Sequence, residues 1–174
     1  VVVDPDVLLG EISDVNQQLS EVSDLTLDPQ NLVVSDRAHL IMPYHINLDL
    51  LEEKRRGNDA IGTTGRGVGP AYLDKVNRPG LRAGELLDPE DLASRLPGIV
   101  EFKNEDLTKI YGAEPVKLDD IFEATLRGAT ELGPYIKPAE YFVAEALESG
   151  ENLILEGAQG ALLDLDHGSY PYVT

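Results

Sequence analysis

Apolar residues recur at helical spacing in several segments of the chain. One segment follows the helix-start signal Asp4-Pro5 and carries apolar side chains at Val7, Leu8, Ile12, Val15 and Leu19. A second shows the same spacing from Leu40 and ends in a basic cluster and Gly57, which predicts a helix with Pro43 near its start. Further helices are predicted at about 71–76, 89–110, 118–132, 138–147 and 161–165.

Two short apolar runs predict buried strands, at Leu32–Val34 and at Leu153–Leu155. A long helical stretch separates them. We therefore expect an α/β protein, mostly helical, whose few short strands belong to a larger sheet with members outside this chain. The helices between the two strands are then an insertion.

The two ends of the sequence carry no polar tail. The first three residues are valines, and Ser169 to Thr174 are largely apolar or aromatic. Natural termini are usually polar and poorly ordered. We expect residues 1–174 to form one domain cut from a longer chain.

Composition narrows the choice of partners. The 32 acidic and 14 basic residues give a formal charge of −18, which repels nucleic acid and anionic membranes. Apolar runs fall far short of a membrane span, and there is no cysteine for a disulfide or a nucleophile. We expect a soluble, cytoplasmic protein. The acidic excess favours a source with a salty cytoplasm, with an ordinary acidic protein as the alternative.

Half of the 14 basic residues nevertheless lie in one stretch, at Lys54, Arg55, Arg56, Arg66, Lys75, Arg78 and Arg82. A locally positive region in an acidic chain suggests a small anionic ligand. Arg78 and Arg82 are placed to bind such an anion or to reach a neighbouring molecule. A solvated basic face is the alternative.

The stretch contains the glycine-rich loop Gly62–Pro70, followed directly by a predicted helix. Glycines let backbone amides approach a phosphate, and a helix N-terminus attracts negative charge. Val68 stands where a Walker A motif needs lysine, so the loop is not of that type. From spacing alone, phosphate binding and a flexible glycine linker both remain open.

Other polar residues leave similar alternatives. Gln159 follows the second predicted strand, where open α/β sheets bind ligands, or is a plain turn residue. Asp164, Asp166 and His167 are metal-ligand types, but a helix cap or a core histidine fits their spacing better. His39 and His45 have no spacing that names a catalytic partner, which favours core or surface roles.

Three segments together resemble the adenylosuccinate synthetase family, in family order. They are Ser35–His39 with Tyr44-His45, then IGTTGRGVGPAYLDK at 61–75, then EGAQGALLDLDHGSYPYVT at 156–174. The last two are long and specific. The resemblance covers essentially the whole chain and identifies it as the central region of a synthetase with a P-loop-like α/β fold.

The resemblance implies a role for four residues in binding inosine monophosphate (IMP). Thr64 and Thr174 contact its 5′-phosphate, and Gln159 lies beside position six of the purine. Arg78 crosses the interface of a homodimer to reach the phosphate in the partner's site. No catalytic or metal-binding residue is implied within this chain, because the family's GTP loop, base and acid lie upstream and its guanine and aspartate segments lie downstream.

The implied reaction joins IMP to L-aspartate with GTP and Mg²⁺, through 6-phosphoryl-IMP. We expect residues 1–174 alone to be inactive. Two alternatives are a stand-alone nucleotide-binding module and a non-enzymatic acidic interaction domain.

Overall fold

The computed structural model describes residues 1–174 as a helix-rich chain with four very short strands. The helices are α1 (Pro5–Ser20), α2 (Pro43–Arg56), α3 (Val68–Asn77), α4 (Pro89–Glu105), α5 (Leu118–Leu132) and α6 (Ala139–Glu148). The strands are β1 (Val2–Val3), β2 (Val34–Ser35), β3 (His39–Leu40) and β4 (Ile136–Lys137). Shorter turns of helix are η1 (Gly57–Asp59), η2 (Ala83–Leu87), η3 (Asp106–Ile110), η4 (Gly133–Tyr135) and η5 (Ala161–Leu163).

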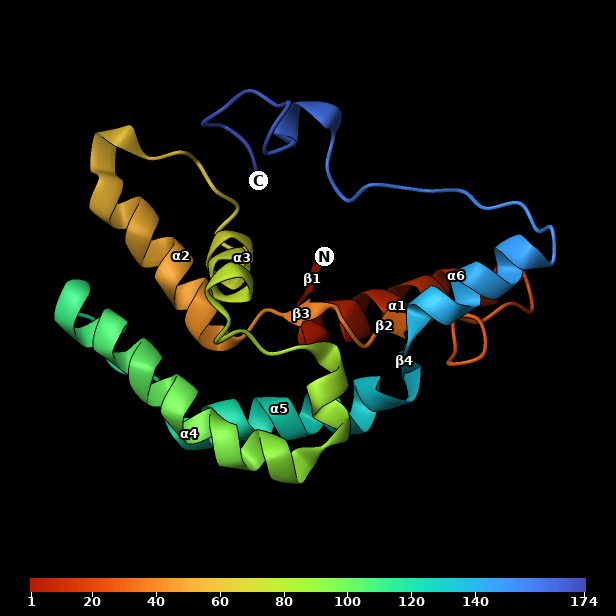
Figure 1. The fold of residues 1–174 in the computed structure, drawn as a ribbon, viewed down its shortest axis with the longest axis horizontal. Coiled ribbons are helices and arrows are strands. Elements are labelled where there is room, and N and C mark those ends of the chain that lie inside the picture. The colour runs from red at the N-terminus through yellow and green to blue at the C-terminus, as the bar shows by residue number, and fades with distance from the viewer.

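The strands form two separate parallel pairs, β1 with β3 and β2 with β4. They lie in the middle of the molecule, with α4 and α5 along one side and α2 and α3 at one end (Figure 1). A parallel pair needs a crossover connection, and α1 supplies it for β1 and β3. The predicted α/β class with few short strands is confirmed.

The predicted helices form, except that the one expected at 161–165 is only the short turn η5. The helix expected at about 71–76 begins earlier, at Val68. The one expected to reach residue 110 leaves α-geometry at Glu105 and continues as the π-helical turn η3. The strand expected at Leu32–Val34 is found at Val34–Ser35. The pairing residues are set by the partner strand, where Val34 lies opposite Ile136.

The start of α1 follows the predicted cap. A carboxylate oxygen of Asp4 accepts hydrogen bonds from the amides of Asp6 (3.0 Å) and Val7 (3.2 Å). It therefore satisfies two of the helix's unpaired donors. Asp6 in turn binds the guanidinium of Arg127 at 3.0 and 2.7 Å, which ties α1 to α5.

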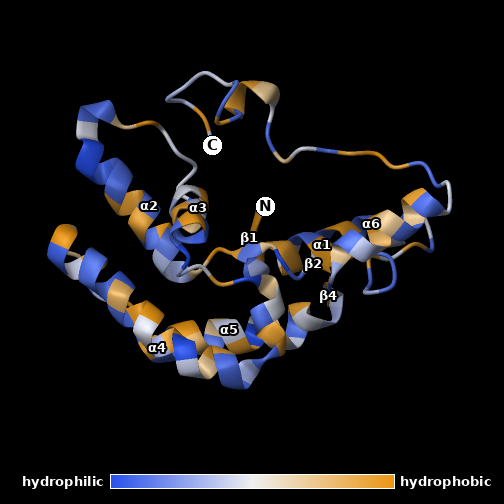
Figure 2. Ribbon diagram, in the orientation of Figure 1, coloured by the Kyte–Doolittle hydropathy of each residue, from blue (hydrophilic) through white to orange (hydrophobic).

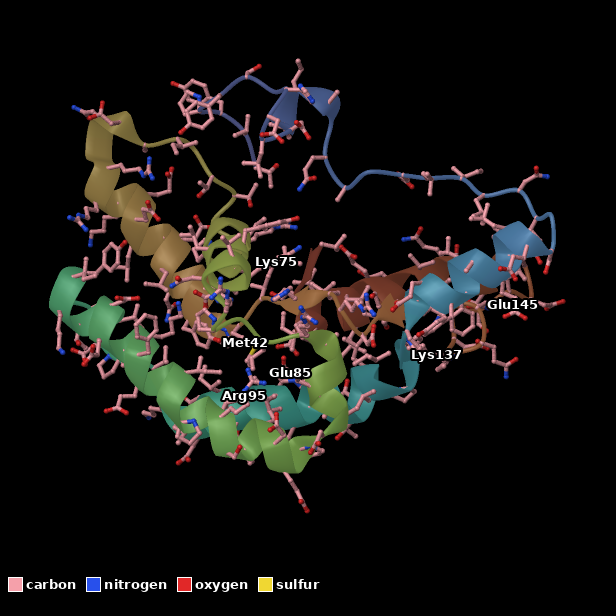
Figure 3. All side chains as sticks on the ribbon, in the orientation of Figure 1. Met42, Lys75, Glu85, Arg95, Lys137 and Glu145 are labelled. Carbon is pink, nitrogen blue, oxygen red and sulfur yellow. The ribbon has the colours of Figure 1, made fainter.

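The core lies between the strands, η2, α4 and α5. It comprises Val34, Ala38, Leu40, Met42, Tyr44, Leu81, Ala83, Leu86, Leu92, Leu96, Val100, Ile121, Leu132 and Ile136. Hydrophobic and hydrophilic residues alternate along α4 and α5 (Figure 2), as expected of helices with one face on a core. Arg95 of α4 pairs with Glu85 of η2, and Lys137 of β4 donates to the carbonyl of Pro29 (Figure 3).

A buried polar network joins α2, α3 and α4. The Nδ1 atom of His45 accepts the Met42 amide at 3.0 Å, so Nε2 carries the proton and donates to Asp74 at 2.8 Å. The Lys103 ammonium donates to the other oxygen of Asp74. All three side chains are buried. Of the core and surface roles left open for the two histidines, both take the core one, since His45 and His39 are buried.

This network predicts acid sensitivity of the folded state. Burial lowers the pKa of His45, and the charge of Lys103 adds to that effect, while Asp74 opposes it. Burial also lowers the pKa of His39, with the charges of Lys75 and Arg82 adding to it. Both folded-state pKa values lie below the usual 6.5, so the unfolded chain takes up protons first as the pH falls.

We therefore expect the free energy of unfolding to decrease as the pH falls below about 6.5, with a slope approaching about 1.4 kcal/mol per pH unit for each histidine. Urea unfolding at pH 7.5, 6.5 and 5.5 measures this. The His45→Gln variant should show a shallower dependence. A free energy of unfolding that stays level or rises between pH 6.5 and 5.5 contradicts the assignment.

Residues 153–155 differ from the prediction. No strand forms at Leu153–Leu155, where Ile154 is 95% and Leu155 91% exposed. The segment that contains them runs as an extended arm from α6 and turns back through η5 (Figure 1). The prediction of a buried strand is wrong for this chain, because a strand needs a neighbouring strand for its backbone groups and none lies beside it.

No helix in the structure is both long enough and apolar enough to cross a membrane.

Candidate functional site

The glycine loop connects η1 to α3 and is held by two carboxylates of α2. One oxygen of Glu53 accepts the amide of Ile61 (3.1 Å), and the other accepts those of Gly62 (2.7 Å) and Thr63 (3.3 Å). These backbone hydrogen bonds, that of Gly62 foremost, lower the pKa of Glu53. The carboxylate therefore stays ionised below the pH at which an ordinary glutamate is protonated.

Asp49, one helical turn earlier, holds the other part of the loop. Its Oδ1 accepts the Thr63 hydroxyl and its Oδ2 accepts the Gly67 amide, both at 2.9 Å. The side chain is buried, and both of its oxygens have a donor. Thr63 and Gly67 are therefore fixed to the same residue of α2.

Gly67 permits this close approach. It has φ of 75°, a left-handed conformation, and a Cβ added there would lie 2.8 Å from the backbone nitrogen of Ile46. Backbone of α2 has little freedom to move away. A side chain at residue 67 therefore displaces either the loop or the helix.

We expect Gly67→Ala to lower the free energy of unfolding by at least about 1–2 kcal/mol, which is the cost of the left-handed conformation for a residue with a Cβ. Thermal unfolding measures it. Gly69→Ala is the matched control, since nothing lies within 4 Å of its Cβ position and its φ is not positive. Equal effects of the two substitutions would show that the close contact with α2 does not matter.

The contacts with α2 narrow the predicted anion site. The amides of Ile61, Gly62, Thr63 and Gly67 are taken by carboxylates, so they are not open to a phosphate. Asp49 also lies on the amide that caps α3, where a second anion would be repelled. The whole loop therefore does not offer donors, although the amides of Val68 and Gly69 in the first turn of α3 make no hydrogen bond to the protein. The amides of Thr64, Gly65 and Arg66 make no hydrogen bond to the protein.

Thr64 is exposed at the middle of this open stretch. Arg78 lies at the far end of α3, where it caps the helix with φ of 79° and donates its amide to the Asp74 carbonyl at 2.7 Å. A helix of 10 residues separates the two, about 15 Å at 1.5 Å per residue. This spacing favours the alternative in which Arg78 reaches a neighbouring molecule over one in which it binds the same anion as Thr64.

The other two predicted ligands lie in the C-terminal arm. Gln159 is exposed in a turn. Thr174 donates its amide to the Leu163 carbonyl at 3.0 Å. No hydrogen bond joins residues 152–174 to the rest of the chain, so the structure does not bring Gln159 and Thr174 onto Thr64.

The remaining candidates have local roles. One oxygen of Asp164 accepts the amides of Asp166 (2.9 Å) and His167 (2.8 Å), which stabilises a turn. No helix follows this turn, so Asp164 does not act as the helix cap considered for it. His167 is exposed, so the core position considered for it is wrong. No group of three His, Cys, Asp or Glu side chains lies close enough together to hold a metal ion.

Sequence reasoning missed the two residues that shape the loop. Asp49 and Glu53 are four residues apart, so they share one face of α2, which was the available signal. That spacing reads equally as a solvated acidic face. Only the fold of the loop shows that the face binds amides.

Fold and loop together define a helix-rich α/β protein. Its glycine loop is hydrogen-bonded to carboxylates of one helix, and the amides of residues 64–66 in that loop have no partner in the protein. The family model for adenylosuccinate synthetase matches residues 1–174. The chain belongs to the adenylosuccinate synthetase family.

Individual relatives agree with this assignment. The chain is 49% identical to an adenylosuccinate synthetase of Dehalococcoides mccartyi over 174 residues, which is all of this chain and 40% of that protein. It is 45% identical to the one of Mycobacterium leprae over the same residues, 39% of that protein. The chain thus spans about two fifths of the length of the curated relatives it matches.

A solved structure shows the same fold. The structure of fully ligated adenylosuccinate synthetase from Plasmodium falciparum superposes with a TM-score of 0.83 at 28% identity. The match covers 99% of this chain and 38% of that one.

Proposed function

We propose that this chain is the central region of an enzyme that joins IMP to L-aspartate with GTP, forming adenylosuccinate. The observation that carries the proposal is the family match over all 174 residues. The open amides around Thr64 support it, because they offer a small cluster of hydrogen-bond donors in a chain whose net charge of −18 repels anions elsewhere.

The C-terminal arm supports placement inside a larger protein. Leu153, Ile154 and Leu155 expose apolar side chains in an extended segment, which is unfavourable in water. We propose that this segment becomes a sheet strand when other parts of the enzyme lie beside it. Gln159 and Thr174, which follow it, then take the positions that the family resemblance gives them.

In the complete enzyme, Thr64 and Thr174 bind the 5′-phosphate and Gln159 lies beside position six of the purine. The enzyme is a homodimer in which Arg78 reaches the phosphate of the partner's site. The position of Arg78 at the far end of α3 from Thr64 supports a contact with another subunit. Arginine suits the task because its charge is permanent and its donors match phosphate oxygens.

The reaction has two steps. Transfer of the γ-phosphoryl group of GTP to the purine oxygen breaks its bond to the β–γ bridging oxygen and converts the purine oxygen into a good leaving group. The amino group of aspartate then attacks C6, loses a proton, and the C–O bond electrons leave with phosphate. Mg²⁺ offsets charge on the transferring phosphates when bound, and its ligands lie outside these 174 residues. We place the enzyme in the cytoplasm, where its nucleotide substrates are found.

Residues 1–174 alone are expected to form no adenylosuccinate from IMP, GTP and aspartate, since they contain no lysine-bearing phosphate loop that could bind GTP. The full-length gene product is expected to form it, with one GDP per turnover. Chromatographic assay of both proteins measures this. A full-length protein that binds IMP without turnover indicates a nucleotide-binding module, and one that binds neither nucleotide indicates an interaction domain.

A further inference from the structure

We propose that Asp49 and Glu53 are positioning residues for the nucleotide phosphate. They pin the glycine loop on both sides of Thr64 and so hold the free amides of Thr64, Gly65 and Arg66 in place for the incoming anion. This inference rests on the proposed function and assigns the loop's donors within it.

The contacts surround Thr64 closely. Thr63, just before it, is held twice, by its amide to Glu53 and by its hydroxyl to Asp49. Gly67, three residues after it, is held through its amide to Asp49. Because the residues on either side are fixed to one rigid helix, the three residues between them have little freedom left to lose when a ligand binds.

The same contacts control where an anion can bind. An amide that already donates to a carboxylate offers nothing to a phosphate, and the carboxylate repels a second anion. Glu53 covers the start of the loop and Asp49 covers the cap of α3. The donors left between them are those of Thr64, Gly65 and Arg66, together with the Thr64 hydroxyl and the charge of Arg66. Directly after the cap, the amides of Val68 and Gly69 in the first turn of α3 are also free, and they lie beside the Asp49 carboxylate's contact with Gly67.

Thr63 and Thr64 therefore have different tasks, although they are adjacent and chemically identical. The Thr63 hydroxyl is used within the protein, on Asp49. The Thr64 side chain is exposed and makes no hydrogen bond to the protein. The structure thus gives an internal reason for Thr64, and not Thr63, to meet the phosphate.

The test uses Glu53→Gln in the full-length enzyme, with Glu52→Gln as the matched control. Glu52 is the neighbouring residue on α2 and pairs only with Arg56, so the control removes the same charge without touching the loop. A glutamine at residue 53 has one acceptor oxygen for three amides, and its NH₂ group opposes an N–H. Thr63→Val is a second, independent variant that removes the hydroxyl held by Asp49.

We expect Glu53→Gln to raise the KM for IMP about tenfold, with kcat and the KM for GTP within about twofold of wild type. Inhibition by inosine, which lacks the phosphate, should keep its Ki. Amide exchange at Ile61, Gly62 and Thr63 should accelerate in Glu53→Gln and not in Glu52→Gln. Thr63→Val should raise the KM for IMP in the same sense.

Unchanged KM for IMP in Glu53→Gln and Thr63→Val, or equal weakening of IMP and inosine, overturns the positioning role. Unchanged amide exchange in Glu53→Gln shows that Glu53 does not hold the loop amides, and so overturns the contact on which the proposal rests. Absence of adenylosuccinate formation by the wild-type enzyme would instead contradict the proposed function. The exchange measurement would still show whether Glu53 holds the loop amides.

Discussion

Replacing Lys103 with methionine is expected to lower the free energy of unfolding by about 3–5 kcal/mol, the usual cost of leaving one member of a buried ion pair without its partner. Lys103 donates to Asp74, and both side chains are buried. Methionine fills a similar volume, so the loss reports the missing ammonium. Asp74 then has only His45 as a hydrogen-bond partner.

Two controls separate this network from ordinary surface charge. Lys109→Met removes an exposed lysine that pairs with Glu105 on its own helical face, and it should cost no more than about 0.5 kcal/mol. Adding Asp74→Asn to Lys103→Met removes the uncompensated charge and should recover part of the loss. Chemical denaturation of the three variants measures all of this. Similar costs for Lys103→Met and Lys109→Met would show that the buried pair contributes nothing special.

Arg78→Leu in the full-length enzyme is expected to weaken IMP binding by about 1.5–3 kcal/mol, or roughly 10- to 150-fold, with GTP affinity nearly unchanged. The physical reason is the loss of a charge-assisted contact with phosphate. Residue 78 has φ of 79°, and both side chains carry a Cβ, so the backbone cost of this conformation is common to both proteins. Steady-state kinetics with each substrate varied in turn gives the result.

Arg37→Leu is the matched control, since Arg37 is an exposed arginine that pairs with Glu140. It should leave the KM of IMP unaltered. If Arg78→Leu raised the KM of GTP as much as that of IMP, the role given to Arg78 would be wrong. If it abolished dimer formation without changing IMP affinity per site, Arg78 would belong to the interface alone.

The helices were predictable because their signals are local. Asp4-Pro5 begins α1 through hydrogen bonds two and three residues away, and Gly57 ends α2. Apolar spacing within each segment then selects the buried face. The signals reside in residues that are neighbours in the sequence, so no knowledge of the rest of the chain is needed.

The strands were less predictable because pairing is not local. Leu153–Leu155 is as apolar as Val34 and its neighbours, but Val34 has Ile136 opposite it and Leu153–Leu155 has no partner in this chain. β1 and β3 have no sequence signal strong enough to be found alone, since each is two residues long. Which apolar run becomes a strand depends on what lies beside it.

The candidate site was predictable in outline and not in detail. Four glycines indicate close approach to a ligand, but they do not show which amides are already bonded. That depends on Glu53 and Asp49, whose carboxylates reach the loop across the turn after α2. In a sequence, acidic residues near a predicted anion site suggest that an anion would be repelled. In this structure they accept hydrogen bonds from the loop's own amides and leave Thr64 free.

The central claim is that the loop around Thr64 binds the 5′-phosphate of IMP, and isothermal titration of the full-length enzyme with IMP and with inosine tests it most directly. Wild type is expected to bind IMP at least about tenfold more tightly than inosine, a difference of about 1.4 kcal/mol. Thr64→Val is expected to reduce this difference while leaving inosine affinity unchanged. Equal affinities for IMP and inosine in wild type, or an unaltered difference in Thr64→Val, would contradict the claim.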